Sequence, residues 1–235
     1  MSRLKLGLLL PSSNTTMEHE FRIMLPTGTS LHASRIGLRK VVINELLAME
    51  KEVKNEASKL ADANVDIIGF GCTTGSLVAG HKYDERIVEH IERTTGKPAV
   101  ATASAVVEAL KFLGLSRISI VTPYTEDLNK LERTFLERSN FVISRMAGLG
   151  LTDNLKIAEV TPKIISNLVR KVDTSRTEGI FISCTNLPTI NMIAKLEKAL
   201  RKPVVSSNTA TLWAMLKRIK HTFHTEKYGK LFLLC

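Results

Sequence analysis

Two apolar segments, each ending in a cysteine, constrain the fold of this chain more than any other feature of its sequence. The first is I-I-G-F-G-C-T-T-G-S at residues 67–76, and the second is G-I-F-I-S-C-T-N-L at residues 179–187. An apolar run closed by glycines and hydroxyl side chains, with a helical pattern beyond it, is typical of a buried parallel strand that delivers a side chain to the loop above a sheet. Cys72 and Cys184 lie 112 positions apart (184 − 72). We therefore predict that the two thiols face each other across one small-molecule site.

Other landmarks repeat with a similar period. Pro11 and Pro123 have the same offset as the cysteines, and each closes an expected strand, Leu4–Leu10 or Ile118–Thr122. The Lys-Pro pairs at residues 97–98 and 202–203 each precede a short strand and an Ala/Thr-rich helix. Strands alternate with helices throughout, which favours parallel sheets covered by helices. The sequence thus predicts an α/β protein with two pseudo-symmetric Rossmann-like halves and an active site in the cleft between them.

The expected division of the chain follows from this repeat. We assign residues 1–103 plus 207–235 to the first α/β half and residues 104–206 to the second, with the final helix packing back on the first half. No Gly/Ser-rich linker marks the border.

Four local expectations bear on the site and its surroundings. Residues 43–63 are expected to form one long amphipathic helix, and Thr15 or Thr16 is expected to cap a helix from Met17 to Leu25. Asn154 is expected in a plain loop. The last segment, from Phe223 to Cys235, is expected either to pack on a subunit neighbour or to form a terminal strand.

Composition excludes several classes of function. The formal net charge is +10, but the basic residues are scattered, only 5% of residues are aromatic, and no nucleic-acid motif is present. We therefore favour a solvated basic surface that attracts anionic metabolites, and expect no nucleic-acid partner. No apolar run approaches the ~20 residues that span a bilayer, so no membrane partner is expected. Three cysteines form neither a disulfide framework nor a zinc spacing, which favours a reducing cytoplasm and no metal.

The residues around the two cysteines favour acid–base or nucleophilic chemistry on an anion. A thiol between a strand end and a helix start lies among backbone N–H groups, which we expect to lower its pKa and produce the reactive thiolate. Hydroxyl and amide side chains in the same loops are expected to hold carboxylates, although each alone is also typical of a turn or cap. They are Ser12, Asn14, Thr73, Thr74, Thr185 and Asn186.

Two reaction types remain open on these grounds. One thiolate can remove a proton next to a carboxylate while the opposite thiol returns one on the other face, which is racemisation. Alternatively, one thiolate can add to an activated double bond and later leave. A protein that keeps the fold but only binds a dicarboxylate is the non-catalytic alternative. His81 is a candidate for tuning a thiol, and Cys235 is expected to be an exposed terminal thiol.

Six motifs together resemble one enzyme family over nearly the whole chain. They are P-S-S-N-T-T-M-E at 11–18, G-C-T-T-G-S at 71–76, V-T-P-Y at 121–124, D-N at 153–154, S-C-T-N at 183–186 and S-S-N-T-A-T-L-W at 206–213. In this combination the chain resembles maleate cis-trans isomerases, which belong with arylmalonate decarboxylases to the aspartate/glutamate racemase superfamily. The resemblance implies two Rossmann-like halves, no metal, no organic cofactor and a homodimer.

The resemblance also implies individual roles. Cys72 would be the nucleophile that adds to the double bond of maleate, and Cys184 would handle the proton or steady the intermediate. Asn14, Thr73 and Thr74 would hold one carboxylate of this small dicarboxylate substrate. The remaining substrate-binding residues would be Tyr124, Asn154, Thr185 and Asn186. The decarboxylases lack the first thiol, so Cys72 argues against simple decarboxylation. A two-thiol racemase of an acidic amino acid or related acid is the alternative enzyme.

Overall fold

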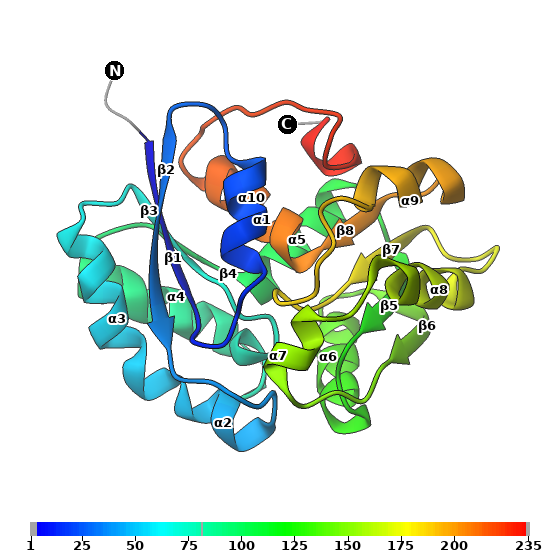
Figure 1. The fold of residues 1–235 in the computed structure, drawn as a ribbon, viewed down its shortest axis with the longest axis horizontal. Coiled ribbons are helices and arrows are strands. Elements are labelled where there is room, and N and C mark those ends of the chain that lie inside the picture. The colour runs from blue at the N-terminus through cyan, green and yellow to red at the C-terminus, as the bar shows by residue number, and fades with distance from the viewer. Residues whose placement is uncertain (1–3, 81, 234–235) are drawn as a thin grey trace.

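Two parallel four-stranded sheets, each flanked by helices, form the core of the computed structural model, which describes residues 4–80 and 82–233. In Figure 1 the first sheet (blue to cyan) lies to the left of the second (green to orange). His81 and Cys235, singled out from the sequence, fall outside the described residues. The α/β class with two similar halves is thereby confirmed.

The strand order is the same in both sheets. The first sheet has the order β2 (Thr29–Ile36), β1 (Leu4–Pro11), β3 (Ile67–Phe70) and β4 (Ala99–Ala101). The second has the order β6 (Val142–Gly148), β5 (Arg117–Thr122), β7 (Gly179–Ile182) and β8 (Val204–Ser206). Within each sheet the four strands run parallel.

The strand register repeats with the offset of the cysteines. Leu9 of β1 lies opposite Phe70 of β3, and Val121 of β5 lies opposite Ile182 of β7. Each of these central strands is almost wholly buried, which explains why its sequence is a continuous apolar run rather than an alternating one. Cys72 and Cys184 follow β3 and β7, so equivalent strand ends deliver them.

Ten α-helices and two short 3₁₀ turns connect the strands within the described part of the chain. The helices are α1 (Met17–Met24), α2 (Ile43–Ala48), α3 (Glu50–Asp62), α4 (Tyr83–Thr95), α5 (Thr102–Phe112), α6 (Glu126–Arg138), α7 (Asn154–Ala158), α8 (Pro162–Val172), α9 (Ile193–Leu200) and α10 (Ser207–Arg218). The 3₁₀ turns are η1 (Thr74–Ser76) and η2 (Lys230–Phe232).

Two local expectations are wrong. The helix expected over residues 43–63 is divided at Met49, where the chain tightens and the Glu52 N–H donates to the Met49 carbonyl three residues back. Asn154, expected in a loop, begins α7, because the Asp153 carboxylate accepts the N–H groups of Leu155 and Lys156 and caps a short helix.

The hydrophobic core is continuous across the two sheets. One cluster of buried side chains joins Leu9 and Phe70 with Val121 and Ile182, and a second joins β1 and β5 residues with α10. Backbone contacts also connect the halves: Lys40 and Asp153 form an isolated antiparallel bridge. Helix α10 packs on α5 and contacts β3, β4 and β8, so it lies between elements of both sheets.

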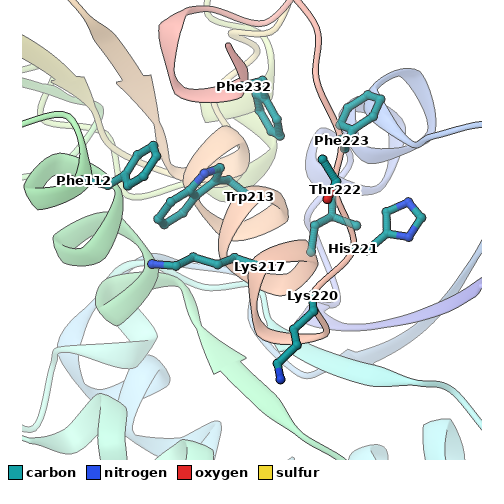
Figure 2. Close-up of a pocket in the computed structure, with 9 residues that line it drawn as sticks. Phe112, Trp213, Lys217, Lys220, His221, Thr222, Phe223 and Phe232 are labelled. Atoms are coloured by element: carbon teal, nitrogen blue, oxygen red, sulfur yellow. The ribbon is translucent and has the colours of Figure 1, made fainter. Parts of the chain in front are cut away.

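The C-terminal segment packs against other parts of the same chain. The Tyr228 hydroxyl donates to the Ile23 carbonyl at 2.7 Å, and the rings of Phe223 and Phe232 meet edge to face at 5.8 Å. The segment forms η2 rather than the terminal strand that was expected as one alternative, because Phe232 inserts into the core beside α10. It borders a pocket of about 330 Å³ whose aromatic walls include Phe112 and Trp213 (Figure 2).

Candidate active site

The first cysteine lies in a tight turn between β3 and η1. Cys72 is buried, and its sulfur accepts the backbone N–H of Gly75 at 3.3 Å. A side chain at residue 75 would bring a Cβ within 2.7 Å of this sulfur, so the contact requires glycine. The Ser76 hydroxyl donates to the carbonyls of Cys72 and Thr73, which holds the turn closed. The sulfur is thus fixed beside an N–H donor.

The second cysteine has an unusual backbone conformation. Cys184 follows β7 with a φ of 101°, a region that residues with a side chain rarely adopt and that costs about 1–3 kcal/mol. Its sulfur accepts the Asn186 N–H at 3.4 Å, and its own N–H donates to the Ser207 hydroxyl at 3.0 Å. Such strain is retained only where the surrounding contacts determine the conformation.

Ser207 connects the two cysteine loops. Its hydroxyl, at the start of α10, accepts the Cys184 N–H and also accepts a hydrogen bond from the Thr73 hydroxyl at 2.9 Å. Thr73 is the neighbour of Cys72 in the chain. One side chain therefore fixes the loops of both thiols, and burial of Thr73, Cys184 and Ser207 excludes water from competing for these bonds.

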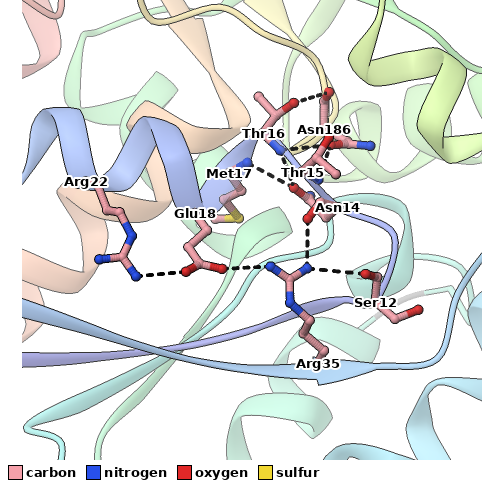
Figure 3. Close-up of polar contacts among 9 residues, drawn as sticks. All are labelled: Ser12, Asn14, Thr15, Thr16, Met17, Glu18, Arg22, Arg35 and Asn186. Carbon is pink, nitrogen blue, oxygen red and sulfur yellow. Dashed lines mark hydrogen bonds and ion pairs between the residues drawn. The ribbon is translucent and has the colours of Figure 1, made fainter.

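The loop after β1 is bound to the Cys184 loop by two asparagines (Figure 3). The Asn14 side chain donates to the Thr185 hydroxyl at 3.0 Å, and its oxygen accepts the N–H groups of Thr16 and Met17. The Asn186 side-chain oxygen accepts the N–H groups of Thr15 and Thr16. Asn14, and not the expected Thr15 or Thr16 side chain, therefore caps α1, because its carbonyl reaches the first N–H groups of the helix.

The ion pair of Arg35 and Glu18 lies beside the loop after β1 and stabilises it. Arg35 donates to the carbonyls of Asn14 (2.8 Å) and Ser12 (3.3 Å), and forms an ion pair with Glu18 at 2.7 Å. Figure 3 shows Arg22 on the other side of the same carboxylate. The two arginines lower the pKa of Glu18, with the Arg22 hydrogen bond as the main cause. The guanidinium of Arg35 therefore fixes the loop through its carbonyls.

Tyr124 and Asn154 also join the cluster. The Tyr124 side chain is buried, and its hydroxyl accepts a hydrogen bond from Ser183 at 3.4 Å and lowers the pKa of Cys184. Asn154 donates to the Ser13 hydroxyl at 2.8 Å, and its carbonyl accepts from the Asn186 side chain at 2.6 Å. Thr185 donates to the Gly71 carbonyl, next to Cys72. Thr74, in η1, is buried and lowers the pKa of Cys72 against the effect of burial.

The nine residues named from the sequence are thus brought together, but many of their polar groups bind each other. Ser12 lies at the edge of the same cluster, where its hydroxyl donates to the Leu38 carbonyl at 3.2 Å and accepts the Leu38 N–H. Their positions at the carboxyl ends of parallel strands agree with the usual place of ligand sites in such sheets.

The pKa values of the thiols differ from the sequence-based expectation. Burial raises the pKa of Cys72 to about 12 and that of Cys184 to about 11, although N–H donors act in the opposite direction. The expected lowering considered only the N–H groups and ignored the loss of water around the sulfur. A negative charge on Cys184 would raise the pKa of Cys72 further. Both thiols are therefore neutral at pH 7 in this structure.

Sequence reasoning missed four polar residues next to the site. Ser207 and Asn208 lie in the quoted motif at 206–213, so their place at a helix start directly after a strand was the available signal. Glu20 and Glu132 gave no signal, because single acidic residues in amphipathic helices are usually exposed. Both are buried: Glu20 binds the loop at residues 189–190, and Glu132 accepts from Ser183.

Two structural observations limit the kinds of site. Among residues 4–80 and 82–233, no group of three or more His, Cys, Asp or Glu side chains is arranged to hold a metal ion. In the same described ranges, no helix is long and apolar enough to cross a membrane.

Comparison with known proteins identifies related enzymes over nearly the whole chain. Residues 6–232 match the family model described as arylmalonate decarboxylase. A maleate isomerase of Pseudomonas putida is 32% identical over 92% of this chain and 91% of its own length. The crystal structure of the maleate isomerase Iso from Pseudomonas putida S16, a cysteine-to-alanine variant with maleate, has a TM-score of 0.94 and 28% identity, with 97% of each chain covered.

A second solved structure contains a covalent state. It is a cysteine-to-serine mutant of the Nocardia farcinica maleate cis-trans isomerase with a covalently bound succinylcysteine intermediate, with a TM-score of 0.94, 24% identity and coverage of 97% of this chain and 98% of that one. At that identity the likeness shows the shared fold. Together with the match over residues 6–232, these findings show that this chain belongs to the arylmalonate decarboxylase family, an enzyme family that includes maleate isomerases.

Proposed function

We propose that this chain is a cofactor-independent cis-trans isomerase that converts maleate, or a similar small cis-dicarboxylate, to its trans isomer through a cysteine nucleophile. The observation that carries the proposal is the pair of buried thiols, Cys72 after β3 and Cys184 after β7, whose loops are joined through Ser207. The relatives named maleate isomerase support the substrate class. The succinylcysteine of the Nocardia protein makes addition of a sulfur to the double bond the reaction to test.

The proposed steps assign one role to each thiol. Cys72 loses its proton to solvent and its sulfur forms a bond to C2 of maleate, while the electron pair of the double bond moves to C3, where Cys184 delivers its proton. The C2–C3 bond is then single and rotates. Cys184 takes the proton back, the double bond re-forms in the trans arrangement, and the C–S bond breaks to release fumarate and the Cys72 thiolate.

Binding of the two carboxylates is assigned to the polar loops. Asn14, Thr73 and Thr74 would hold one carboxylate. The other would be held by Tyr124, Asn154, Thr185 and Asn186. Because these groups now bind one another, an incoming carboxylate would exchange those hydrogen bonds for its own. Uncharged donors suit a reaction in which negative charge moves from the Cys72 sulfur through C3 to the Cys184 sulfur, since they add no fixed charge that would favour one of these positions.

The test is direct conversion of maleate by the purified protein, with fumarate followed by proton NMR. Turnover that depends on Cys72, together with a succinyl adduct on the Cys72 peptide in mass spectrometry, is the expected result. Unchanged turnover in Cys72→Ala would exclude the covalent mechanism.

Racemisation of an acidic amino acid or related acid is the second candidate. The observation that favours it is that the two buried thiols come from equivalent strand ends of opposite sheets, as a two-base mechanism requires. Exchange of the α-hydrogen in heavy water with loss of optical rotation would support this candidate. Thermal stabilisation by maleate without turnover of either substrate class would instead indicate a dicarboxylate-binding protein.

Two further proposals concern the protein in the cell. We propose a homodimer and a cytoplasmic location, the first from the family resemblance and the second from the unpaired cysteines. Sedimentation velocity would test the dimer, and fractionation of the host cell would test the location.

A further inference from the structure

A buried carboxyl lies directly behind Cys184 and has no part in the steps proposed above. Glu132, on α6, is only 1% exposed, and its Oε1 accepts a hydrogen bond from Ser183. Ser183 is the neighbour of Cys184 in the chain, and its hydroxyl also lies 3.4 Å from the Tyr124 hydroxyl. The Tyr124 hydroxyl in turn lies close enough to Cys184 to lower the pKa of its thiol. A chain of hydrogen bonds therefore runs from Glu132 through Ser183 to Tyr124, whose hydroxyl acts on the sulfur.

The other carboxyl oxygen of Glu132 is unpartnered. Its Oε2 is buried and makes no hydrogen bond within the described structure. Glu132 borders a small pocket whose walls are mainly apolar and include Leu77, Val106 and Phe181. A buried carboxylate with an unsatisfied oxygen and apolar neighbours is costly, and burial raises the pKa of Glu132 to about 8. The carboxyl is therefore protonated at pH 7.

The protonation state of Glu132 fixes the direction in which the hydrogen bonds from Glu132 to Tyr124 are donated, because each hydroxyl carries a single proton. When Glu132 is charged, its oxygen takes the Ser183 proton, Ser183 accepts from Tyr124, and the Tyr124 proton points away from the sulfur. When Glu132 is neutral, its O–H can donate to Ser183, Ser183 donates to Tyr124, and the Tyr124 proton is free for Cys184. Only the neutral form directs every donor toward the sulfur.

We propose that Glu132 is a positioning residue that, in its neutral form, directs the hydrogen bonds of Ser183 and Tyr124 toward the sulfur of Cys184 and so stabilises its thiolate. The proposal rests on the role assigned to Cys184 in the proposed function and adds a control on that role. Ionisation of Glu132 reverses the direction of these hydrogen bonds and places a second negative charge near the sulfur. Both changes oppose the Cys184 thiolate.

The surroundings of Glu132 leave few other groups that could produce this effect. The titratable side chains that face it are Tyr124 and Cys184, each of which is affected by its charge. The walls supplied by α5, β7 and the Cys72 loop are uncharged: Ala103, Val106, Phe181, Thr73 and Leu77. On α6 itself, the neighbouring wall residues Phe135 and Leu136 are apolar. A titration near pH 8 that acts on Cys184 is therefore assigned to Glu132.

The test compares the reactivity of Cys184 in the unchanged chain and in Glu132→Gln as a function of pH. Glutamine keeps the shape and donates an N–H to Ser183, but it cannot ionise. The rate of iodoacetamide labelling of the Cys184 peptide, followed by mass spectrometry, reports the thiolate fraction. The control is Glu137→Gln, an exposed residue of the same helix whose carboxylate faces Arg133 at the surface.

We expect the two proteins to label at similar relative rates near pH 7 and to diverge above pH 8, with Glu132→Gln several-fold faster at pH 9.5. A shift of one pKa unit in Cys184 would give about a tenfold difference. Glu137→Gln should follow the unchanged chain. Ser183→Ala breaks the hydrogen-bond chain but leaves the charge of Glu132 in place, so it should reduce the step without removing it. A parallel pH dependence in all four proteins would overturn the proposal.

Labelling and turnover separate this proposal from the proposed function. If maleate is not converted but the labelling of Cys184 changes as described, the assigned reaction is wrong and the role of Glu132 stands. If maleate is converted and the ratio of activity at pH 9 to that at pH 7 is the same in Glu132→Gln as in the unchanged chain, the reaction stands and the role of Glu132 does not.

Discussion

Glu20 and Glu132 occupy equivalent positions in the two halves, yet their surroundings differ. Each lies nine residues after a proline at the end of the first strand of its half: Pro11, the last residue of β1, or Pro123, directly after β5. Glu20 accepts four hydrogen bonds, from the N–H groups of Thr189 and Ile190 and from the side chains of Thr189 and Asn208. Glu132 accepts one, from Ser183, and its second oxygen has none.

The difference shows how a repeated fold can acquire two functions at one position. All four partners of Glu20 donate, which suits an ionised carboxylate that binds the loop after Cys184 to α1. The burial that raises the pKa of Glu20 is opposed by each of these donors. For Glu132, only the Ser183 hydrogen bond opposes the effect of burial on the pKa, which stays at about 8. Ionisation of Glu132 near this pH can therefore affect Cys184. The satisfied copy holds the structure, and the unsatisfied copy can respond to pH.

The largest expected effect separates the two cysteines. Cys72→Ala should abolish both turnover and adduct formation, because Cys72 is the assigned source of the C–S bond. Cys184→Ala should lower turnover by roughly 10²–10⁴-fold, the usual contribution of a positioned acid or base, while leaving the succinyl adduct on Cys72 detectable. Rapid-quench mass spectrometry measures both quantities. An adduct on Cys184 in the Cys72→Ala protein would reverse the assigned roles.

Replacing each glutamate by methionine sharpens the comparison of the two carboxyls. Glu20→Met removes the acceptor of two buried N–H groups and should lower the free energy of unfolding by roughly 3 kcal/mol or more. Glu132→Met removes a carboxyl that is mostly unsatisfied and should leave this free energy unchanged or raise it. Urea unfolding at pH 7 measures both values. Equal losses would mean that the hydrogen bonds of Glu20 add nothing.

A third expectation concerns the pH dependence of stability. The pKa of Glu132 in the folded chain, about 8, lies above its usual value of 4.5. The folded state therefore binds this proton more tightly, and its stabilisation is complete below about pH 4.5 and is lost as pH rises toward 8. The slope is up to about 1.4 kcal/mol per pH unit.

Glu132→Gln isolates this contribution from that of other carboxyls. Exposed groups such as Glu45 and Glu178, whose pKa values are lowered by backbone N–H groups, act with the opposite sign but are common to both proteins. The unfolding free energy of Glu132→Gln minus that of the unchanged chain should therefore increase from pH 5 to pH 8. A constant difference would place the pKa of Glu132 near its usual value.

The smallest expected effect tests the backbone of the two cysteine loops. Cys184 has a φ of 101°, whereas Cys72 is not among the residues with positive φ. Glycine adopts positive φ without strain, so Cys184→Gly should be more stable than Cys184→Ala by about 1 kcal/mol. At residue 72 the order should reverse, with glycine less stable than alanine by about 0.5–1 kcal/mol. Alanine more stable than glycine at both positions would indicate that the strain at Cys184 is absent in solution.

Much of the fold could be predicted from the sequence because its signals are local. The buried central strands gave continuous apolar runs, and the matching offsets of the prolines and cysteines reflect a register that is the same in both sheets. The break at Met49 and the helix that begins at Asn154 could not be predicted with the same rules. Both depend on hydrogen bonds that short-range periodicity does not encode.

The candidate site could be predicted in part. Residue types at strand ends indicated Cys72, Cys184 and the polar loops, and the family resemblance added Tyr124 and Asn154. The raised pKa values of the thiols and the role of Glu132 could not be predicted, because both result from the exclusion of water by the folded chain. How deeply a residue is buried depends on the whole tertiary structure, and the sequence pattern of one helix does not show it.

The two hydrophobic clusters that join the sheets have a consequence for the history of the chain. We propose that the division into residues 1–103 plus 207–235 and residues 104–206 records an ancestral duplication, since strand order and register repeat across it. Each cluster now draws side chains from both parts, so neither part could be expressed alone without exposing one wall of both cores. The copies have become mutually dependent, and the protein should melt in a single calorimetric transition even though it was built twice.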